Sequence, residues 1–100
     1  MIALAALGSA ALPAGVSAHT MPPITARTVA KQAVAKIKRE THAASGRVVN
    51  CSRLSKHRFV CKGEERYTTG ADRCTFNITV RYTSPTARTT KYAISSYRCF

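Results

Sequence analysis

Four cysteines are the residues whose type and spacing could do chemistry, and they stand at Cys51, Cys61, Cys74 and Cys99. Zinc sites and redox-active thiol pairs usually bring two cysteines together as Cys-x-x-Cys, and the sequence contains no such pair. In an exported chain, four cysteines instead indicate two disulfide bonds, for which three connectivities are possible. We therefore expect disulfides, and we assign no metal ligand, no cofactor and no catalytic thiol.

Hairpin geometry ranks the connectivities. If residues 55–57 form a three-residue hairpin loop, counting outward places Cys51 opposite Cys61. Directly opposed residues of an antiparallel pair lie close enough for a disulfide, or nearly so. The same counting in the next hairpin places Cys74 opposite Cys99. We therefore predict one bridge across each hairpin.

The second hairpin also allows a competing register. A shift of one residue would pair Val80 with Ile94, which buries both side chains better. It would also turn Cys74 and Cys99 to opposite faces, because side chains alternate along a strand. A β-bulge would reconcile the bridge with apolar pairing.

The remaining candidates for catalysis are the 3 histidines and 4 acidic residues, namely His19, His42, His57, Glu40, Glu64, Glu65 and Asp72. A histidine-activated nucleophile or a glycosidase carboxylate pair would have to be assembled from these residues. The Glu64-Glu65 pair, next to Arg66, is interpreted as part of a solvated loop with local ion pairs. We therefore expect no catalytic residues and no enzyme, with a small hydrolase as the least favoured alternative.

The strongest chemical signal is the basic excess. The 16 lysines and arginines give a net charge of +12, which attracts polyanions such as nucleic acid, anionic lipid head groups or acidic polysaccharide. These bases are spread over every expected element, which favours non-specific attraction over a designed groove. The candidate polyanion contacts are Arg53, Lys56, Arg58, Lys62, Arg81, Lys91 and Arg98.

A helix followed by strands must position these residues. Apolar and small residues recur with helical spacing over residues 26–44, with Thr25 as the expected N-cap and Gly46 as the stop. The pattern then changes to alternation, which predicts two hairpins from strands at residues 47–54, 58–63, 74–83 and 89–99. The predicted fold is α+β: one N-terminal helix packed on a four-stranded antiparallel sheet. This order of elements resembles cystatin-like and inhibitor-like folds.

The N-terminal region is typical of an export signal. Residues 2–12 are apolar or small, and this run is shorter than the about 20 residues that span a bilayer. The small residues at positions 16–18 fit cleavage by signal peptidase, although a basic start is missing. We predict a signal peptide at residues 1–18, an extended leader at 19–25 and a single disulfide-bonded domain at 26–100. The alternative is an apolar helix docked on the domain.

Beyond these patterns, the segment Cys-Ser-Arg-Leu-Ser-Lys-His-Arg-Phe-Val-Cys at residues 51–61 resembles small exported proteins of high-GC bacteria. Those proteins share the preceding Ala/Arg-rich helix, a second cysteine pair and an ending like Arg98-Cys99, and they have no assigned activity. The similarity covers about residues 26–100. It implies local cysteine pairing and a bacterial source.

These observations predict a secreted, periplasmic or envelope protein without catalysis and without a transmembrane segment in its mature part. Its expected partner is an unknown protein or an envelope polyanion, with non-specific attraction to nucleic acid. The alternative is a polyanion-binding or antimicrobial cationic protein. One continuous basic face would favour a polyanion partner, whereas scattered charge would favour a protein partner.

Overall fold

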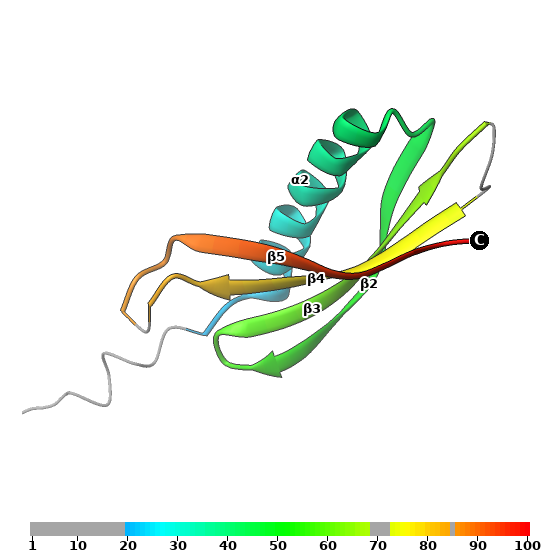
Figure 1. Ribbon diagram of the computed structural model, residues 1–100. Helices are drawn as coiled ribbons and strands as arrows, with labels where there is room; N and C mark the ends of the chain where they lie inside the picture. Colours follow the sequence, from blue (N-terminus) through cyan, green and yellow to red (C-terminus); the bar gives the residue numbers. More distant parts are fainter. Residues whose placement is uncertain (1–19, 69–72, 85) are drawn as a thin grey trace, which may run out of the picture.

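One helix packs on a four-stranded antiparallel sheet in the computed structural model, which describes residues 20–68, 73–84 and 86–100 (Figure 1). The predicted α+β class is therefore confirmed, while the predicted signal peptide at residues 1–18 lies outside the described residues. The strands follow the chain in the order β2-β3-β4-β5. The elements are α2 (Pro23–Thr41), β2 (Ser45–Ser55), β3 (Arg58–Arg66), β4 (Arg73–Tyr82) and β5 (Thr90–Cys99).

The helix begins and ends earlier than its pattern predicted. Pro23 opens it, which suits proline because the first helical N–H needs no partner, and no side chain caps it, so the expected Thr25 cap is wrong. At the other end His42 adopts the left-handed conformation at φ 58°, and the N–H of Ala43 bonds to the carbonyl of Lys38 at 3.1 Å. Gly46 consequently lies inside β2 instead of ending the helix.

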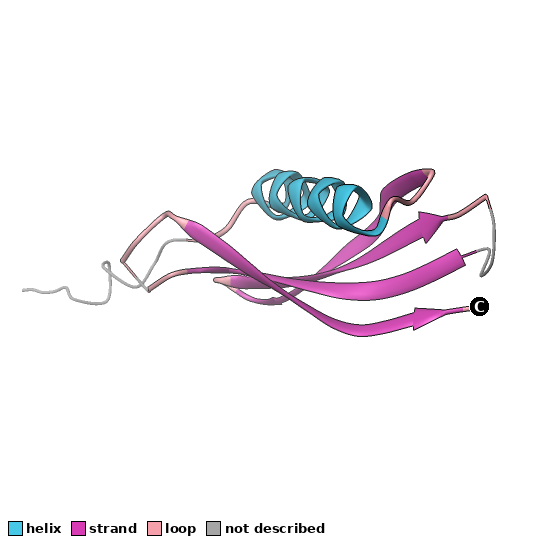
Figure 2. Ribbon diagram, turned by 45° about the horizontal axis from the view of Figure 1, so that its top comes forward, coloured by secondary structure: helices cyan, strands magenta, loops and turns pink. Residues whose placement is uncertain are grey.

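The core lies between the helix and one face of the sheet, which we call the inner face (Figure 2). Met21 is fully buried there, and its N–H bonds to the carbonyl of Lys56 at 2.8 Å, so part of the predicted leader is packed on the domain. Alanines on the helix let it approach the sheet closely. The other buried residues of this cluster are Ala26, Ala30, Ala33, Val34, Val48, Phe59, Cys61, Phe76, Ile78, Val80 and Tyr82.

The first disulfide joins Cys51 to Cys61, which stand directly opposite in the pairing of β2 with β3 and have Cα atoms 3.9 Å apart. This confirms the predicted bridge. The expected three-residue loop is wrong, however. Ser55 pairs with Arg58, and the register shifts between Arg53 and Ser55 so that the cysteines still face each other.

The second disulfide joins Cys74 to Cys99, again as predicted. The pairing of β4 with β5 shifts between Thr75 and Asn77, where two residues of β5 oppose Phe76. One of them, Ser96, has a φ of 56°, which is the left-handed conformation that such bulges use.

The same bulge settles the competing registers. Val80 pairs with Tyr92 and Ile78 pairs with Ile94, so the competing register, with Val80 opposite Ile94, does not form. A bulge does combine the bridge with an apolar pairing, but that pairing is of Ile78 with Ile94 and not the expected one of Val80 with Ile94.

Candidate anion-binding face of the sheet

The face of the sheet turned away from the helix, here called the outer face, carries basic side chains on all four strands. No described helix or strand packs on this face (Figure 2). The alternation of strand residues and the cross-strand pairing place a set of bases there, which we call the outer-face bases. They are Arg47, Arg58, Lys62, Arg66, Arg73, Arg81, Lys91 and Arg98.

Most of the predicted polyanion contacts belong to this set, but Arg53 and Lys56 do not. The Arg53 guanidinium lies 4.5 Å from the ring centroid of Phe59, and it donates a hydrogen bond of 2.9 Å to the carbonyl of Met21. It therefore helps to hold the N-terminal segment against the domain. Lys56 lies in the turn between β2 and β3.

Sequence reasoning missed Arg47, Arg66 and Arg73 as members of the set. Arg47 pairs with Glu64 across β2 and β3, and Arg66 pairs with Arg73 across β3 and β4. The signal that could have found Arg66 is the alternation of β3, which continues beyond Gly63 into the segment that we had interpreted as a loop.

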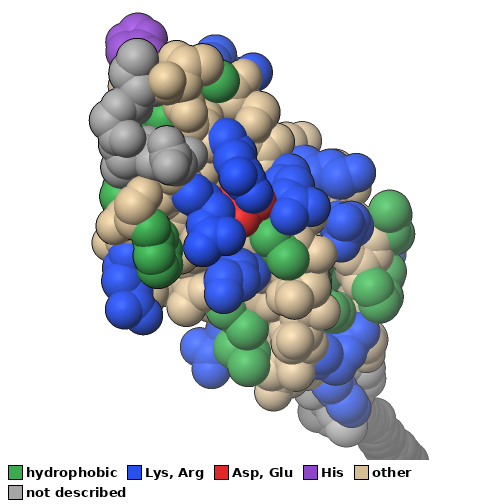
Figure 3. All heavy atoms as spheres, turned by 90° about the vertical axis from the view of Figure 1, so that its right-hand side faces the viewer, with side chains coloured by type: hydrophobic (Ala, Val, Ile, Leu, Met, Phe, Trp, Pro, Cys, Tyr) green, Lys and Arg blue, Asp and Glu red, His purple; other side chains and the backbone are tan. Residues whose placement is uncertain are grey.

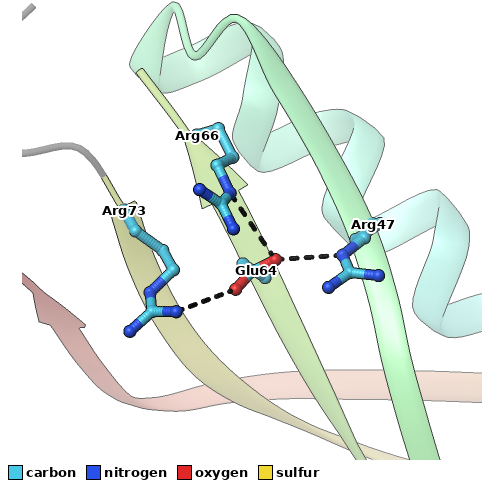
Figure 4. A network of polar contacts seen from close by, with 4 residues as sticks. All are labelled: Arg47, Glu64, Arg66 and Arg73. Carbon is cyan, nitrogen blue, oxygen red and sulfur yellow. Dashed lines mark hydrogen bonds and ion pairs between the residues drawn. The ribbon is translucent and has the colours of Figure 1, made fainter. Parts of the chain in front are cut away.

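Glu64 lies at the centre of these three arginines (Figure 4). Its carboxylate accepts a hydrogen bond from Arg47 Nε at 2.9 Å and forms ion pairs with Arg66 at 3.9 Å and Arg73 at 3.7 Å. Its side chain is only 8% exposed, so the expectation of a solvated loop is wrong. The hydrogen bond from Arg47 lowers the pKa of Glu64, and the three positive charges add to this against the opposing effect of burial.

One carboxylate cannot neutralise three guanidinium groups. Figure 3 shows this end of the molecule, where lysine and arginine side chains gather around the small visible part of an acidic side chain. Glu64 therefore holds the arginines in place while the surface around it stays positive. Such an arrangement reduces the entropy that an incoming anion would have to remove.

Glu65 points to the inner face and is fully buried. Its carboxylate accepts hydrogen bonds from Thr41 at 2.9 Å, from Tyr67 at 3.1 Å and from Tyr97 at 2.7 Å. Burial and the bond to Glu65 together raise the pKa of Tyr97. This carboxylate ties the end of the helix to β5, which is a structural role and corrects its placement in a solvated loop.

The described histidines lie at opposite ends of the molecule. His42 ends the helix, and His57 lies in the turn between β2 and β3 (Figure 1). Nδ1 of His57 is buried and has no hydrogen-bond partner among the described residues. His19 and Asp72 lie outside them, and Glu40 is exposed on the helix.

A cavity of about 270 Å³ opens beside the turn between β2 and β3, and its walls include His57, Arg58, Arg81 and Ser84. In the described part of the chain, no group of three or more His, Cys, Asp or Glu side chains could hold a metal ion. Nor does any helix there have the length and apolar character needed to cross a membrane.

Comparison of the chain with protein-family models, with curated proteins and with solved structures finds no match. The resemblance to cystatin-like folds and to exported bacterial proteins therefore stays a prediction. What is shown is an α+β domain with two disulfide bonds, which are typical of oxidising compartments.

Proposed function

We propose that this protein is an exported, non-catalytic polyanion-binding protein, and that the outer face of its sheet is the binding surface. The observation that carries the proposal is the position of the outer-face bases on one face that the helix leaves uncovered. The sequence is compatible with a protein partner and with a polyanion. Half of the 16 bases share this face, in one group at each end of the sheet with Lys62 between them, and this concentration favours the polyanion.

Sheet geometry supports this choice. Neighbouring strands lie about 4.8 Å apart, and residues two apart on one strand lie about 6.7 Å apart. Opposed bases such as Arg58 and Arg81 are therefore about one strand spacing apart, close to the spacing of about 3.4 Å per phosphate in one strand of DNA, whereas the bases within β3 recur only every fourth residue, about 13 Å apart. Long lysine and arginine side chains can adjust their reach over these differences.

The proposed setting is outside the cytoplasm. Two disulfide bonds in a small domain support it, because reducing compartments disfavour them. The apolar run at residues 2–12 and the small residues at 16–18 support export through a cleaved signal peptide.

The test compares two triple variants with the same change of charge. Substituting three outer-face bases by glutamine should weaken heparin binding about tenfold or more and reduce the salt slope by about 3, whereas substituting three helix lysines should weaken it less than about threefold. Calorimetry at several salt concentrations measures both quantities. The sheet variant is R58Q/K62Q/R81Q and the helix variant is K31Q/K36Q/K38Q.

Two results would contradict the proposal. Equal losses in the two variants would mean that only total charge matters. The second result is a heparin affinity of the unsubstituted protein that does not fall steeply as salt is raised. This result would show that the binding is not electrostatic, and a protein partner would then be the favoured hypothesis.

A further inference from the structure

We propose that the end of the outer face beside the turn between β2 and β3 is a site for a single phosphate group, held by Arg58 and Arg81. This inference rests on the proposed function, since it names the chemical group that one part of the outer face would bind. It is based on a difference between the two ends of the sheet: an arginine pair at one end has a carboxylate beside it, and the arginine pair at the other end does not.

Two pairs of arginines face each other across β3 and β4. Arg66 stands opposite Arg73 at one end, and Arg58 stands opposite Arg81 at the other. Like charges directly opposed on adjacent strands repel. At the first end the carboxylate of Glu64 lies 3.9 Å from Arg66 and 3.7 Å from Arg73 and offsets this repulsion.

The second pair has no such carboxylate. Lys91 stands opposite Arg81 on β5, so three cations form one row across three strands. Within the described residues, Arg58, Arg81 and Lys91 form no ion pair. An external anion bound between them would offset their repulsion, as the carboxylate of Glu64 does at the other end of the sheet.

The cavity of about 270 Å³ lies at this pair, and both arginines line it. Two serine hydroxyls of its wall already accept hydrogen bonds, Ser55 from the N–H of His57 at 3.3 Å and Ser84 from the N–H of Ala87 at 3.1 Å. A hydroxyl that accepts a bond still has its own proton to donate. The wall therefore offers two kinds of donor for oxygen atoms of an anion.

Phosphate fits this set of groups better than a carboxylate does. The planar guanidinium binds phosphate oxygens through paired hydrogen bonds. A phosphate monoester carries a charge of about −1.5 to −2 at neutral pH, which offsets about half to two-thirds of the charge of a row of three cations, whereas a carboxylate offsets one-third.

Inorganic phosphate is the probe for the first experiment. At constant ionic strength, titration followed by NMR should give saturable amide shifts at residues 55–58 and 81–84, and acetate at the same concentrations should give much smaller ones. Equal shifts with acetate, or larger shifts around Glu64 than around the cavity, would overturn the proposal. Binding of glycerol phosphate at the same residues would show that the site also accepts an esterified phosphate.

A substitution that supplies an internal carboxylate gives the sharper test. Thr79 lies on the outer face, two residues before Arg81, and pairs with Val60 and Ala93. T79E places a carboxylate diagonally across from Arg58 and Lys91, as Glu64 lies across from Arg73. We expect T79E to weaken phosphate binding about tenfold and the uncharged control T79Q to change it less than about twofold.

Heparin binding separates this inference from the proposed function. Unchanged phosphate affinity in T79E, measured on a protein whose circular dichroism matches T79Q, would overturn the phosphate site. In that case heparin affinity still tests the outer face as a whole through the R58Q/K62Q/R81Q variant. Weak heparin binding by the unsubstituted protein would instead contradict the proposed function itself.

Discussion

Two adjacent glutamates have opposite environments in this protein. Glu64 lies on the outer face among arginines, and Glu65 lies on the inner face among hydroxyl groups. Both are buried because successive residues of a strand point to opposite faces and both faces are crowded at this position. Each carboxylate is stabilised by the partners that its own face supplies.

The charge of Glu64 makes a pH-dependent contribution to stability. Its pKa in the folded protein lies below the ordinary value of 4.5, so in this range the unfolded chain binds more protons. The stabilisation is therefore present above about pH 4.5 and is lost as the pH falls through the folded pKa. We expect E64Q to lower the free energy of unfolding by about 1 kcal/mol at pH 7 and by much less in acid.

Urea denaturation at pH 7 and pH 3 measures this difference. E40Q is the matched control, because Glu40 is exposed on the helix and its substitution should change the result little at either pH. A loss of stability in E64Q that is the same at both pH values would show that packing, and not charge, is the source.

The Tyr97 hydroxyl is the second residue-scale contributor. Its bond of 2.7 Å to Glu65 is the shortest of the three that this carboxylate accepts. Y97F should lower the free energy of unfolding by about 1–3 kcal/mol, because a buried charged acceptor loses a donor. Y92F is the control, since Tyr92 lies on the same strand with a similar exposed fraction, 36% against 42% for Tyr97, and its hydroxyl makes none of the hydrogen bonds found among the described residues. Equal urea midpoints for the two variants would contradict this account.

At the scale of elements, the length of β3 is set by the two strands that flank it. β3 is central between β2 and β4, so its backbone groups find partners as far as Arg66. Gly63 within it lies under the ring of Phe76, where a Cβ atom would collide with the ring. That ring in turn stacks on Tyr97 at a centroid distance of 5.5 Å. The glycine thus marks close packing inside a strand and not the start of a loop.

The two disulfides join hairpins of different length, and we expect unequal contributions. Cys51–Cys61 spans 10 residues and Cys74–Cys99 spans 25. The chain-entropy relation gives about 2.7 kcal/mol for the shorter loop and about 3.5 kcal/mol for the longer one. Replacing each pair by alanines and measuring urea denaturation tests the order. A larger loss from the Cys51–Cys61 replacement would mean that native contacts around that bridge outweigh loop entropy.

The whole molecule combines a small core with a net charge of +12. Repulsion among these charges destabilises the folded state, and salt reduces it. Raising sodium chloride from about 0.01 M to about 0.1 M shortens the Debye length from about 30 Å to about 10 Å. We expect the melting temperature to rise by a few degrees over this range in a scanning calorimeter. Sucrose at matched osmolarity is the control, and a falling melting temperature would mean that attractive pairs dominate.

By itself, the sequence determined the kinds of element, their order and the pairing of the cysteines. The elements follow from local periodicity. Counting along each hairpin named the two observed bridges, although each hairpin contains a register shift that the count did not include. The sequence also determined the large positive charge. Its errors were at the ends of elements, such as the start of the helix, where the preference of proline for the first helical position outweighs the capping preference of Thr25.

Only the tertiary structure decided which charges share a face. Arg58, Arg81 and Lys91 are far apart in the chain, and they meet because register across three strands aligns them. That register depends on the bulge at Ser96, which packing selects and which no local pattern specifies. The burial of Glu64 was decided in the same way, because its arginine partners come from three strands. Alternation fixes which residues of one strand share a face, but the contacts between strands fix what that face can bind.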